Sequence, residues 1–264
     1  MAYAIYFKQD GKEYNLYDLP RDFIINVNIN LSRLGLTKLP NLSGVVVNGD
    51  FNCSHNNLED LECAPKVVNG NFFCFSNRLK SLYGAPKVVG AQFNCSNNKL
   101  QDLNYSPVFV NGEFDCSRNQ LIDLYNQTKF IGGNFICHHN KLKTLKNAPT
   151  NIGDGFNFCN NELTTLYGAP EFTMGYFLCA HNQLKSLEYA PRIVNGHFNC
   201  SNNQLKSLKY APRIVGYGLN CSSNLLTDFR NAPKVINGDL IIWENPFKED
   251  YQKILERYNR NHGR

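Results

Sequence analysis

The chain has 264 residues, 42% of them hydrophobic and 19% charged, with a formal net charge of +5. This composition suits a packed core and excludes wholesale disorder, and the modest charge does not by itself indicate a nucleic-acid partner. No basic segment followed by a long apolar run opens the chain, and no apolar run approaches the ~18 residues that span a bilayer. We therefore expect a soluble protein that is not exported by the usual route.

The first predicted element is a β-hairpin that caps the amino-terminal end within residues 1–27. Tyr3–Phe7 and Glu13–Tyr17 flank the segment Lys8–Lys12, whose Asp-Gly pair is a strong hairpin signal. A degenerate turn follows, in which leucines approximate the later repeat: Leu31, Leu34, Leu36 and Leu39. A solenoid needs such a cap because the core of its first turn would otherwise face water.

Repeats of 21 residues fill residues 28–247. One asparagine recurs ten times without a slip in register, and we call this set the lattice asparagines: Asn56, Asn77, Asn98, Asn119, Asn140, Asn161, Asn182, Asn203, Asn224 and Asn245. Leucines follow most of them after two and five residues, and a proline follows after nine. The turn can be written V-x-G-x-F-x-C-S-x-N-x-L-x-x-L-x-x-A-P-x-x, and a period of this length is typical of a solenoid.

Each position of the turn has a physical role. The F-x-C alternation predicts a short strand whose two apolar residues face inward and whose neighbours face outward. The asparagine amide can bond backbone groups of adjacent turns, and the two leucines return to the core. Proline then fixes an extended return leg that is too short for a helix, and glycine permits the turn into the next strand. We expect a β-rich repeat solenoid with a parallel concave sheet and an extended or polyproline-like convex side without helices.

The cysteines follow the same lattice. Eight of the ten are separated by 21 residues or by twice that number: Cys53, Cys74, Cys95, Cys116, Cys137, Cys179, Cys200 and Cys221. A disulfide framework has irregular spacing and a zinc site uses short C-x-x-C pairs, so a cysteine that recurs once per turn indicates a reduced core residue. We expect no metal, no cofactor, and a reducing compartment such as a cytoplasm.

The run F-x-C-S-x-N-x-L-x-x-L resembles the second half of the leucine-rich-repeat signature, L-x-L-x-x-N-x-L, with Phe and Cys in its strand positions. In its short repeat it is similar to arrays carried by bacteria, large bacteriophages and giant viruses. The resemblance implies a parallel sheet on the concave face and, most often, binding of a protein. It carries over no catalytic residues.

The last predicted element is an amphipathic helix. Tyr251, Ile254, Leu255 and Tyr258 recur at helical spacing within Lys248–Asn259. Residues 248–264 are therefore expected to form a capping helix and a tail. No linker interrupts the array, and we predict a single domain over residues 1–264.

Departures from the repeat at outward positions indicate a partner surface. In most turns the outward side chains are small and polar, with Asn before the strand cysteine and Ser after it. Four strands carry aromatic, apolar or histidine side chains instead, and we predict that these residues bind a partner: Phe73, Phe75, Ile136, His138, His139, Tyr176, Leu178, His181 and Trp243. Such residues are typical of interface cores. The competing interpretation is local packing, of Ile241 and Trp243 under the C-terminal helix and of Phe73 and Phe75 against the hairpin.

Two further patterns carry less weight. Cys159 stands one place outward from the cysteine lattice and beside His138, which suggests a metal half-site or an activated thiol. Either chemistry needs more groups than these two, so we expect neither catalysis nor metal binding.

Lysines and arginines form stripes ten and three residues after the lattice asparagines, but without interleaved stacking aromatics. We expect these stripes to be a solvated face and nucleic acid to be an unfavoured partner.

The sequence thus predicts a non-enzymatic scaffold that binds another protein through its concave sheet, in the cytoplasm of a bacterial or phage-infected cell. Two alternatives stay open: a structural component of a homo-oligomer or virus particle, and nucleic-acid binding along the basic flank. Specificity of such a scaffold lies in its surface, so the outward residues decide among these functions.

Overall fold

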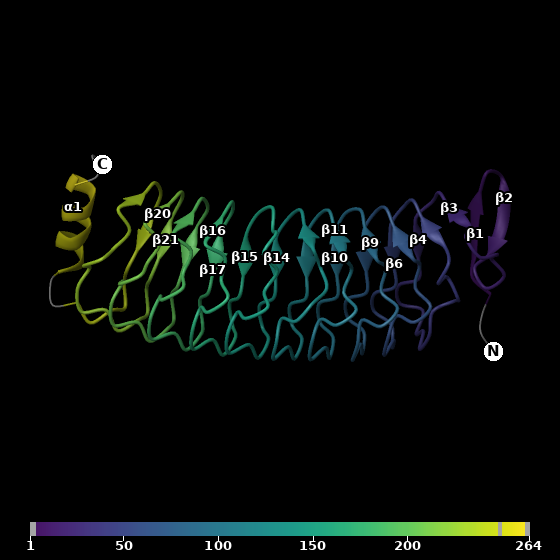
Figure 1. The fold of residues 1–264 in the computed structure, drawn as a ribbon, viewed down its shortest axis with the longest axis horizontal. Helices are drawn as coiled ribbons and strands as arrows, with labels where there is room; N and C mark the ends of the chain where they lie inside the picture. The colour runs from purple at the N-terminus through teal and green to yellow at the C-terminus, as the bar shows by residue number, and fades with distance from the viewer. Residues whose placement is uncertain (1–3, 248–249, 262–264) are drawn as a thin grey trace. The chain divides into compact units, whose positions relative to one another are not determined.

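The computed structural model describes residues 4–247 and 250–261. These residues fall into two compact units, Met1–Ile136 (unit 1) and Cys137–Arg264 (unit 2). Each unit is a stack of coils in which short strands alternate with turns, and a helix ends unit 2 (Figure 1). The boundary between the units falls inside a repeat, and the single domain over the whole chain stays a prediction.

Unit 1 begins with the predicted hairpin. Strands β1 (Tyr6–Gln9) and β2 (Lys12–Asn15) pair antiparallel through a turn in which Asp10 and Gly11 have φ of 52° and 72°. A type I′ turn requires positive φ at both central residues, and Asp-Gly adopts them readily. The hairpin is confirmed, with strands closer to the turn than predicted, and Tyr3 lies outside the described residues.

Aromatic rings fasten this hairpin to the first coil. The ring centroids of Phe7, Tyr14 and Phe23 lie 5.1 to 6.4 Å from one another. Directly after Phe23, strand β3 (Ile24–Ile25) already pairs with the next coil. Strand pairing between coils therefore begins inside the segment that we predicted to be cap alone.

Two parallel sheets form the faces of unit 1. The Phe-strand sheet takes its strands from the F-x-C part of each turn: β4 (Ile29–Asn30), β6 (Phe51–Asn52), β8 (Phe72–Phe73), β10 (Phe93–Asn94), β12 (Phe114–Asp115) and β14 (Phe135–Ile136). The Val-strand sheet takes its strands from the return leg: β3, β5 (Val46–Val47), β7 (Val67–Val68), β9 (Val88–Val89), β11 (Phe109–Val110) and β13 (Phe130–Ile131). Each residue pairs with its equivalent in the next turn, as Phe72 does with Phe93.

Unit 2 repeats both sheets. Its Phe-strand sheet contains β15 (Phe156–Asn157), β17 (Phe177–Leu178), β19 (Phe198–Asn199), β21 (Leu219–Asn220) and β23 (Leu240–Ile241). Its Val-strand sheet contains β16 (Phe172–Thr173), β18 (Ile193–Val194), β20 (Ile214–Val215) and β22 (Val235–Ile236). The described return legs are extended and free of helix, as predicted. They pair into a ladder because β-branched residues recur in register, so the polyproline-like option was wrong.

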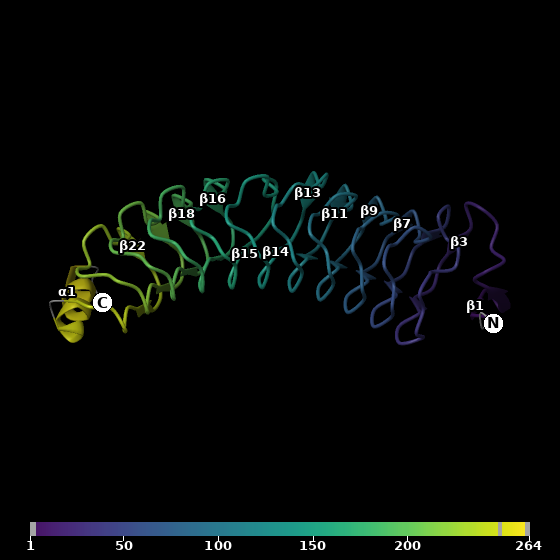
Figure 2. The same cartoon turned by 90° about the horizontal axis from the view of Figure 1, so that it is seen from below.

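The carboxyl-terminal helix is confirmed as α1 (Tyr251–Asn261), which lies beside the last coil of unit 2 (Figure 2). Asp250 caps it, because its carboxylate accepts the backbone N–H groups of Gln252 (2.9 Å) and Lys253 (3.3 Å). Ile254 and Tyr258 turn their buried side chains toward the coils, and the Tyr258 ring meets that of Phe229. The helix therefore covers the apolar end of the stack.

The core contains the residues that recur in the repeat. In unit 1 a row of five phenylalanine rings runs through the coils, stacked at first and then edge to face, with successive centroids 5.0 to 5.7 Å apart: Phe51, Phe72, Phe93, Phe114 and Phe135. In unit 2 Phe158 takes the place of a cysteine and packs against Phe156 and Phe177. The eight lattice cysteines are buried in the core, as predicted. Burial raises the pKa of Cys200 to about 12, which keeps its thiol protonated.

The lattice asparagines join each coil to the one before it. The amide of Asn119 donates to the carbonyls of Cys95 (3.1 Å) and Cys116 (3.1 Å), and its oxygen accepts the N–H of Leu100 (3.0 Å). The residue before each lattice asparagine has a φ between 51° and 56°, although none of the ten is glycine. This left-handed bend, unfavourable for most side chains, aims the amide back at the preceding coil.

Candidate functional site

The predicted partner residues of unit 1 form a small aromatic cluster. Phe73 and Phe75 are half-buried, with ring centroids 6.1 Å apart, and Phe75 also meets the His55 ring at 5.1 Å. The cluster stands on the Phe-strand sheet rather than against the hairpin, so the competing interpretation of local packing against the hairpin was wrong. Ile136 is half-buried on β14, the last strand of the unit.

The predicted histidines lie in unit 2. The Nδ1 atoms of His138 and His139 are hydrogen-bonded at 2.8 Å, so one ring donates the proton that the other accepts. His139 and His181 occupy the left-handed turn before a lattice asparagine, with φ of 56° and 55°, and are exposed. These two side chains therefore leave the backbone after the strand has ended.

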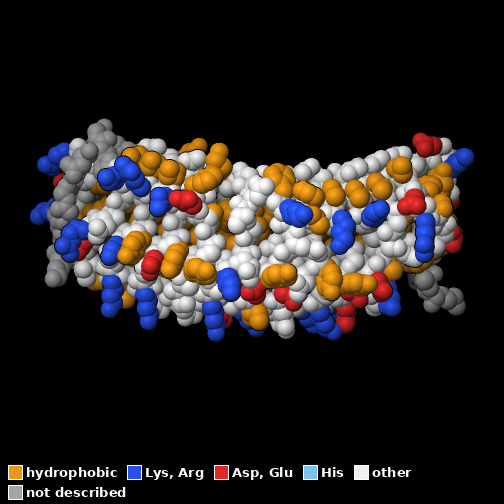
Figure 3. Space-filling model, in the orientation of Figure 1, with side chains coloured by type: hydrophobic (Ala, Val, Ile, Leu, Met, Phe, Trp, Pro, Cys, Tyr) orange, Lys and Arg blue, Asp and Glu red, His pale blue; other side chains and the backbone are white. Residues whose placement is uncertain are grey.

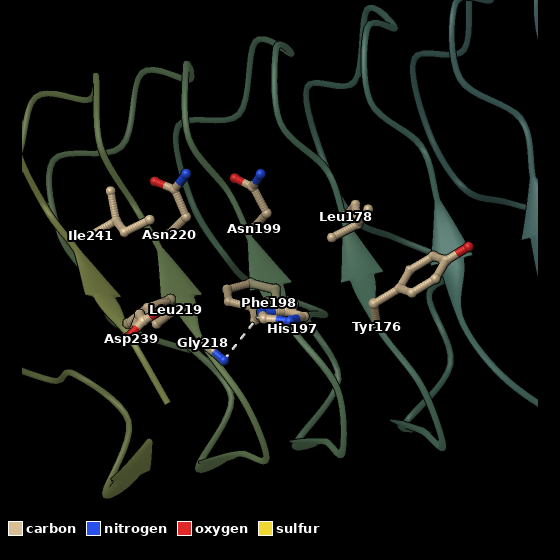
Figure 4. A pocket seen from close by; sticks show the side chains of 10 residues that line it. All are labelled: Tyr176, Leu178, His197, Phe198, Asn199, Gly218, Leu219, Asn220, Asp239 and Ile241. Atoms are coloured by element: carbon tan, nitrogen blue, oxygen red, sulfur yellow. Dashed lines mark hydrogen bonds between the residues drawn. The ribbon is translucent and has the colours of Figure 1, made fainter. Parts of the chain in front are cut away.

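Two of the predicted residues, Tyr176 and Leu178, line a pocket of about 290 Å³ on the Phe-strand sheet of unit 2. The lining lies on β17, β19, β21 and β23 and directly before them, and Figure 4 shows it as two rows across these strands. One row is Leu178, Asn199, Asn220 and Ile241, and the other is Tyr176, His197, Gly218 and Asp239. The floor is apolar and belongs to the core strands.

The second row occupies what we call the pre-strand position, the residue directly before each Phe-strand. In unit 1 this position is polar at every regular turn: Asp50, Asn71, Gln92, Glu113 and Asn134. In unit 2 two of its members are glycine: Gly155, Tyr176, His197, Gly218 and Asp239. Gly218 has no side chain between His197 and Asp239, and a Cβ there would lie 3.1 Å from Nδ1 of His197 and 3.2 Å from the carbonyl oxygen of Asp239. The glycine therefore lets the imidazole lie against its backbone at the edge of the pocket.

In unit 1 the same position is closed by a hydrogen-bonded ladder. The Asn71 amide donates to Asp50 (3.0 Å), and the Gln92 amide donates to Glu113 (2.8 Å). Asn134 donates to the other oxygen of Glu113 (3.4 Å). Partial burial raises the pKa of Glu113, and the nearby charge of Asp115 raises it further.

The polar side of the pocket is held in one orientation. The Gly218 N–H donates to Nδ1 of His197 (3.2 Å), and the imidazole stacks on the Tyr217 ring with centroids 5.5 Å apart. An accepting Nδ1 places the proton of the neutral ring on Nε2. His197 thus offers an N–H donor, Asp239 offers a carboxylate, and Leu178 and Ile241 offer apolar surface.

A glycine also positions Tyr176. A Cβ at Gly155 would lie 2.8 Å from Cγ and Cδ2 of the Tyr176 ring and from its backbone nitrogen. The ring therefore lies over the backbone of the preceding coil. This contact holds one wall of the pocket in place.

At the far end of the sheet, Trp243 keeps 52% of its surface exposed. Ile241 lines the pocket. Packing under the C-terminal helix, the competing interpretation, leaves about half of the Trp243 side chain uncovered, and the buried residues of α1 are Ile254 and Tyr258. The tryptophan is left available to a partner.

His197, Gly218 and Asp239 were not predicted from the sequence. They lie outside the positions that flank each strand cysteine, and glycine is a turn residue elsewhere in the repeat. The signal is a shift of the repeat glycine by one place, from two residues before the strand to one, in Gly153-Asp154-Gly155 and Gly216-Tyr217-Gly218. That shift removes a side chain from the face of the sheet.

The thiol chemistry weighed for Cys159 finds no support. Burial raises the pKa of the Cys159 thiol, whereas an activated thiol needs a lowered one. Among the described residues, no group of three or more His, Cys, Asp or Glu side chains could hold a metal ion.

One premise about the basic stripes was wrong. On the Val-strand side of unit 2, exposed tyrosines line the same groove as Arg192 and Arg213. They stand six and seven residues after the lattice asparagines, and the extended return leg folds them beside the arginines. Aromatic side chains therefore do accompany the basic stripe.

No protein-family model matches the chain, and no curated protein matches it. Solved structures do, among them YopM from Yersinia enterocolitica WA-314, with a TM-score of 0.51 and 22% identity over 83% of this chain. The match spans 56% of that neighbour, a leucine-rich-repeat protein. The fold is of the leucine-rich-repeat type.

A leucine-rich-repeat fold is in general a protein-interaction scaffold and is typically non-enzymatic. At this level of identity the neighbour shows the fold alone. Among the described residues no helix is long and apolar enough to cross a membrane.

Proposed function

We propose that the protein is a non-enzymatic scaffold that binds a partner protein through the Phe-strand sheet of unit 2. The observation that carries the proposal is the pocket at Gly218, which is open where the equivalent position of unit 1 is filled. A side chain of the partner would enter between Leu178 and Ile241, with Tyr176 and Trp243 as flanking contacts.

The dimensions favour a protein partner over a small metabolite. Small-molecule sites enclose their ligand in roughly 300–1,000 Å³. This pocket, at about 290 Å³, is shallow and open along the sheet. Interfaces anchor single aromatic or aliphatic side chains in such pockets and surround them with polar contacts that exclude water. His197, Asp239 and the two asparagines supply that polar rim.

The absence of catalysis and the location belong to the same proposal. The raised pKa of Cys159 supports a scaffold without a nucleophile. The proposed location is the cytoplasm of a bacterial or phage-infected cell, and burial of eight cysteines in the core supports a reducing compartment of this kind.

The test fills the pocket with a residue that the fold already accepts. Asn stands at the pre-strand position of unit 1 in Asn71 and Asn134. At Gly218 its Cβ would lie 3.1 Å from Nδ1 of His197, so Gly218→Asn should displace the imidazole and obstruct the pocket. We expect affinity for the partner to fall by about tenfold or more, since buried contacts at such anchors contribute about 2 kcal/mol. Partners are captured from the native host with the wild-type chain, and the purified complex is measured by calorimetry.

The matched control is Gln92→Asn, the same residue at the same position of unit 1, which should leave affinity unchanged. A second variant, Tyr176→Ser with Leu178→Ser, removes two walls and should abolish capture without lowering the melting temperature. Equal affinity of all three variants and the wild type would sink the proposal.

A second candidate function rests on the cluster of Phe73, Phe75 and His55. The strands on either side of it in unit 1 carry Asn and Ser at the same outward positions, and apolar clusters of this kind serve self-association in structural assemblies. Self-association predicts dimers or larger species that Phe73→Asn with Phe75→Ser disperses. A strict monomer in sedimentation up to about 100 μM, well above typical interface dissociation constants, excludes this candidate.

A further inference from the structure

The Val-strand side of unit 2 carries a row of exposed tyrosines. Tyr167, Tyr189 and Tyr210 each keep 52% of their surface exposed. The rings of Tyr167 and Tyr189 meet edge to face, with centroids 5.5 Å apart and planes at 84°. Burial of ring surface in the core does not explain this row, because half of each side chain faces solvent.

These tyrosines line a groove of about 540 Å³ together with Arg192 and Arg213. Arg192 pairs with Glu171 at 3.5 Å, and both side chains are largely exposed, so water screens the pair. Arg213 forms no ion pair among the residues that the structure describes. Figure 3 shows this side of the molecule, with Lys and Arg between rows of hydrophobic side chains. The groove thus combines aromatic walls with a basic strip.

The backbone holds the rings in place before any ligand arrives. Gly168, directly after Tyr167, has a φ of 97°, and a Cβ there would collide with the carbonyl of Leu145. The glycine lets the turn approach so closely that the Tyr167 carbonyl accepts the N–H of Leu145 at 3.0 Å. Tyr189 and Tyr210 occupy left-handed turns with φ of 68° and 69°. A fixed backbone reduces the entropy lost when a ligand binds.

Unit 1 contains the same arrangement independently. Tyr83 precedes Gly84 and meets Tyr105 edge to face, with centroids 5.5 Å apart and planes at 88°. These rings line a groove of about 270 Å³ with Lys66 and Lys87. The pairing of a Tyr-Gly turn with a basic return leg therefore occurs in both units.

We propose that the Tyr–Arg groove of unit 2, lined by Tyr167, Tyr189, Tyr210, Arg192 and Arg213, binds single-stranded nucleic acid. Bases stack on the tyrosine rings, and the guanidinium groups contact phosphates, the combination by which sequence-tolerant single-strand binders work. An acidic peptide would use the arginines and leave the rings idle. A lipid headgroup would use the charge but not a row of rings along a groove.

This surface is separate from the proposed protein-binding pocket. The pocket belongs to the Phe-strand sheet of unit 2, and the groove belongs to the turns and return legs that form its Val-strand side. A negative result for the nucleic-acid groove therefore does not contradict the protein-binding pocket, and the reverse holds as well. The variants below leave every residue of the pocket unchanged.

The test measures fluorescence anisotropy of a labelled oligothymidylate of about 20 nucleotides with the full chain at 50 and 200 mM salt. Two or three phosphate contacts predict that affinity falls roughly 7- to 20-fold over this range. Tyr189→Asn with Tyr210→Asn should lower affinity about tenfold or more, because each ring loses a stacked base. Asn suits these positions because Asn147 and Asn231 occupy their equivalents with φ of 65° and 61°.

Arg192→Gln with Arg213→Gln should lower affinity and flatten the salt dependence, and it tests the groove even if the tyrosine variant fails to fold. Lys185→Gln with Lys206→Gln removes the same charge from exposed positions outside the groove and should have a much smaller effect. No binding at 50 mM salt overturns the proposal, as does an equal loss in the lysine control. Binding of polyglutamate or of anionic vesicles in place of the oligonucleotide overturns it as well.

Discussion

Unit 1 and unit 2 are built from the same turn, yet their Phe-strand faces differ consistently at the pre-strand position. In unit 1 the pre-strand side chains close into a ladder that contains Gln92 and Glu113 bonded at 2.8 Å. In unit 2 the ladder is interrupted at Gly155 and Gly218, where a tyrosine, a histidine and a pocket take its place. The two faces therefore differ in the side chains that unit 2 lacks as much as in the side chains that it gains.

The comparison separates architecture from function. The lattice asparagines recur in both units and the inward positions stay apolar, so they explain why the coils stack and say nothing about partners. The pre-strand position is free to vary because its side chain faces solvent. The choice of residue at the pre-strand position is limited only by contact with the equivalent side chains of the neighbouring coils.

The largest loss of unfolding free energy is expected at the lattice asparagines, which both units share. Asn182→Ala in unit 2 removes an amide that bonds the carbonyls of Phe158 and Cys179, both at 3.1 Å, and the N–H of Leu163 at 2.9 Å. Asn119→Ala removes the equivalent bonds in unit 1. Because buried backbone groups lose their partners, each variant should lose about 3 kcal/mol or more of unfolding free energy.

Guanidinium unfolding followed by circular dichroism measures both variants, with the exposed Gln183→Ala as a control that should stay within about 0.5 kcal/mol of the wild type. Similar losses in the two units would confirm a common skeleton. A loss below about 1 kcal/mol for Asn182→Ala would mean that the amides do not join the coils.

Self-similarity of the sequence was enough to predict this skeleton. The recurrence of Asn, Leu and Cys fixes what faces inward, and the hairpin and the helix carried local signals of their own in Asp10-Gly11 and in the spacing of Ile254 and Tyr258. The Val-strand ladder was not predicted, because two-residue strands leave no alternating pattern to detect.

The candidate site was predicted only in part, for a physical reason. Tyr176 and Leu178 were found because they add bulk to a default surface. The pocket was missed because glycine, at Gly218, stands where unit 1 has a polar side chain, and because its histidine is oriented by a backbone N–H that no sequence pattern reveals. The tyrosine groove was missed because its rings and arginines belong to different parts of the turn.

An intermediate loss of unfolding free energy is expected at the pre-strand position, where the two units differ. Gly155→Ala in unit 2 places a Cβ 2.8 Å from the Tyr176 ring and from its backbone nitrogen, so the ring or the coil must move. Overpacking of this kind should cost about 1–3 kcal/mol of unfolding free energy. Asn134→Ala places alanine at the equivalent pre-strand position of unit 1. It should lower the unfolding free energy by less than about 0.5 kcal/mol.

Thermal and chemical unfolding compare the pair, and the ring resonances of Tyr176 report its displacement. Equal stability of the two alanine variants, with unmoved Tyr176 resonances, would contradict the view that Gly155 is required by the ring.

The smallest effect is expected from the charge inside the ladder of unit 1. Glu113 has its pKa raised above the ordinary 4.5, chiefly by partial burial and then by Asp115. A raised pKa in the folded state means that the protonated carboxyl stabilises the fold at low pH. That contribution is lost as the pH rises through the folded pKa.

Glu113→Gln keeps an amide in the ladder and removes the charge, so its stability relative to the wild type should be greater at pH 7 than at pH 4. Because part of the carboxylate faces water, the difference should be only a few tenths of a kcal/mol. Urea unfolding of both proteins at the two pH values measures it. The same relative stability at both pH values would mean that the Gln92 and Asn134 amides fully compensate the charge, and that the ladder of unit 1 tolerates an ionised carboxylate at no cost to the fold.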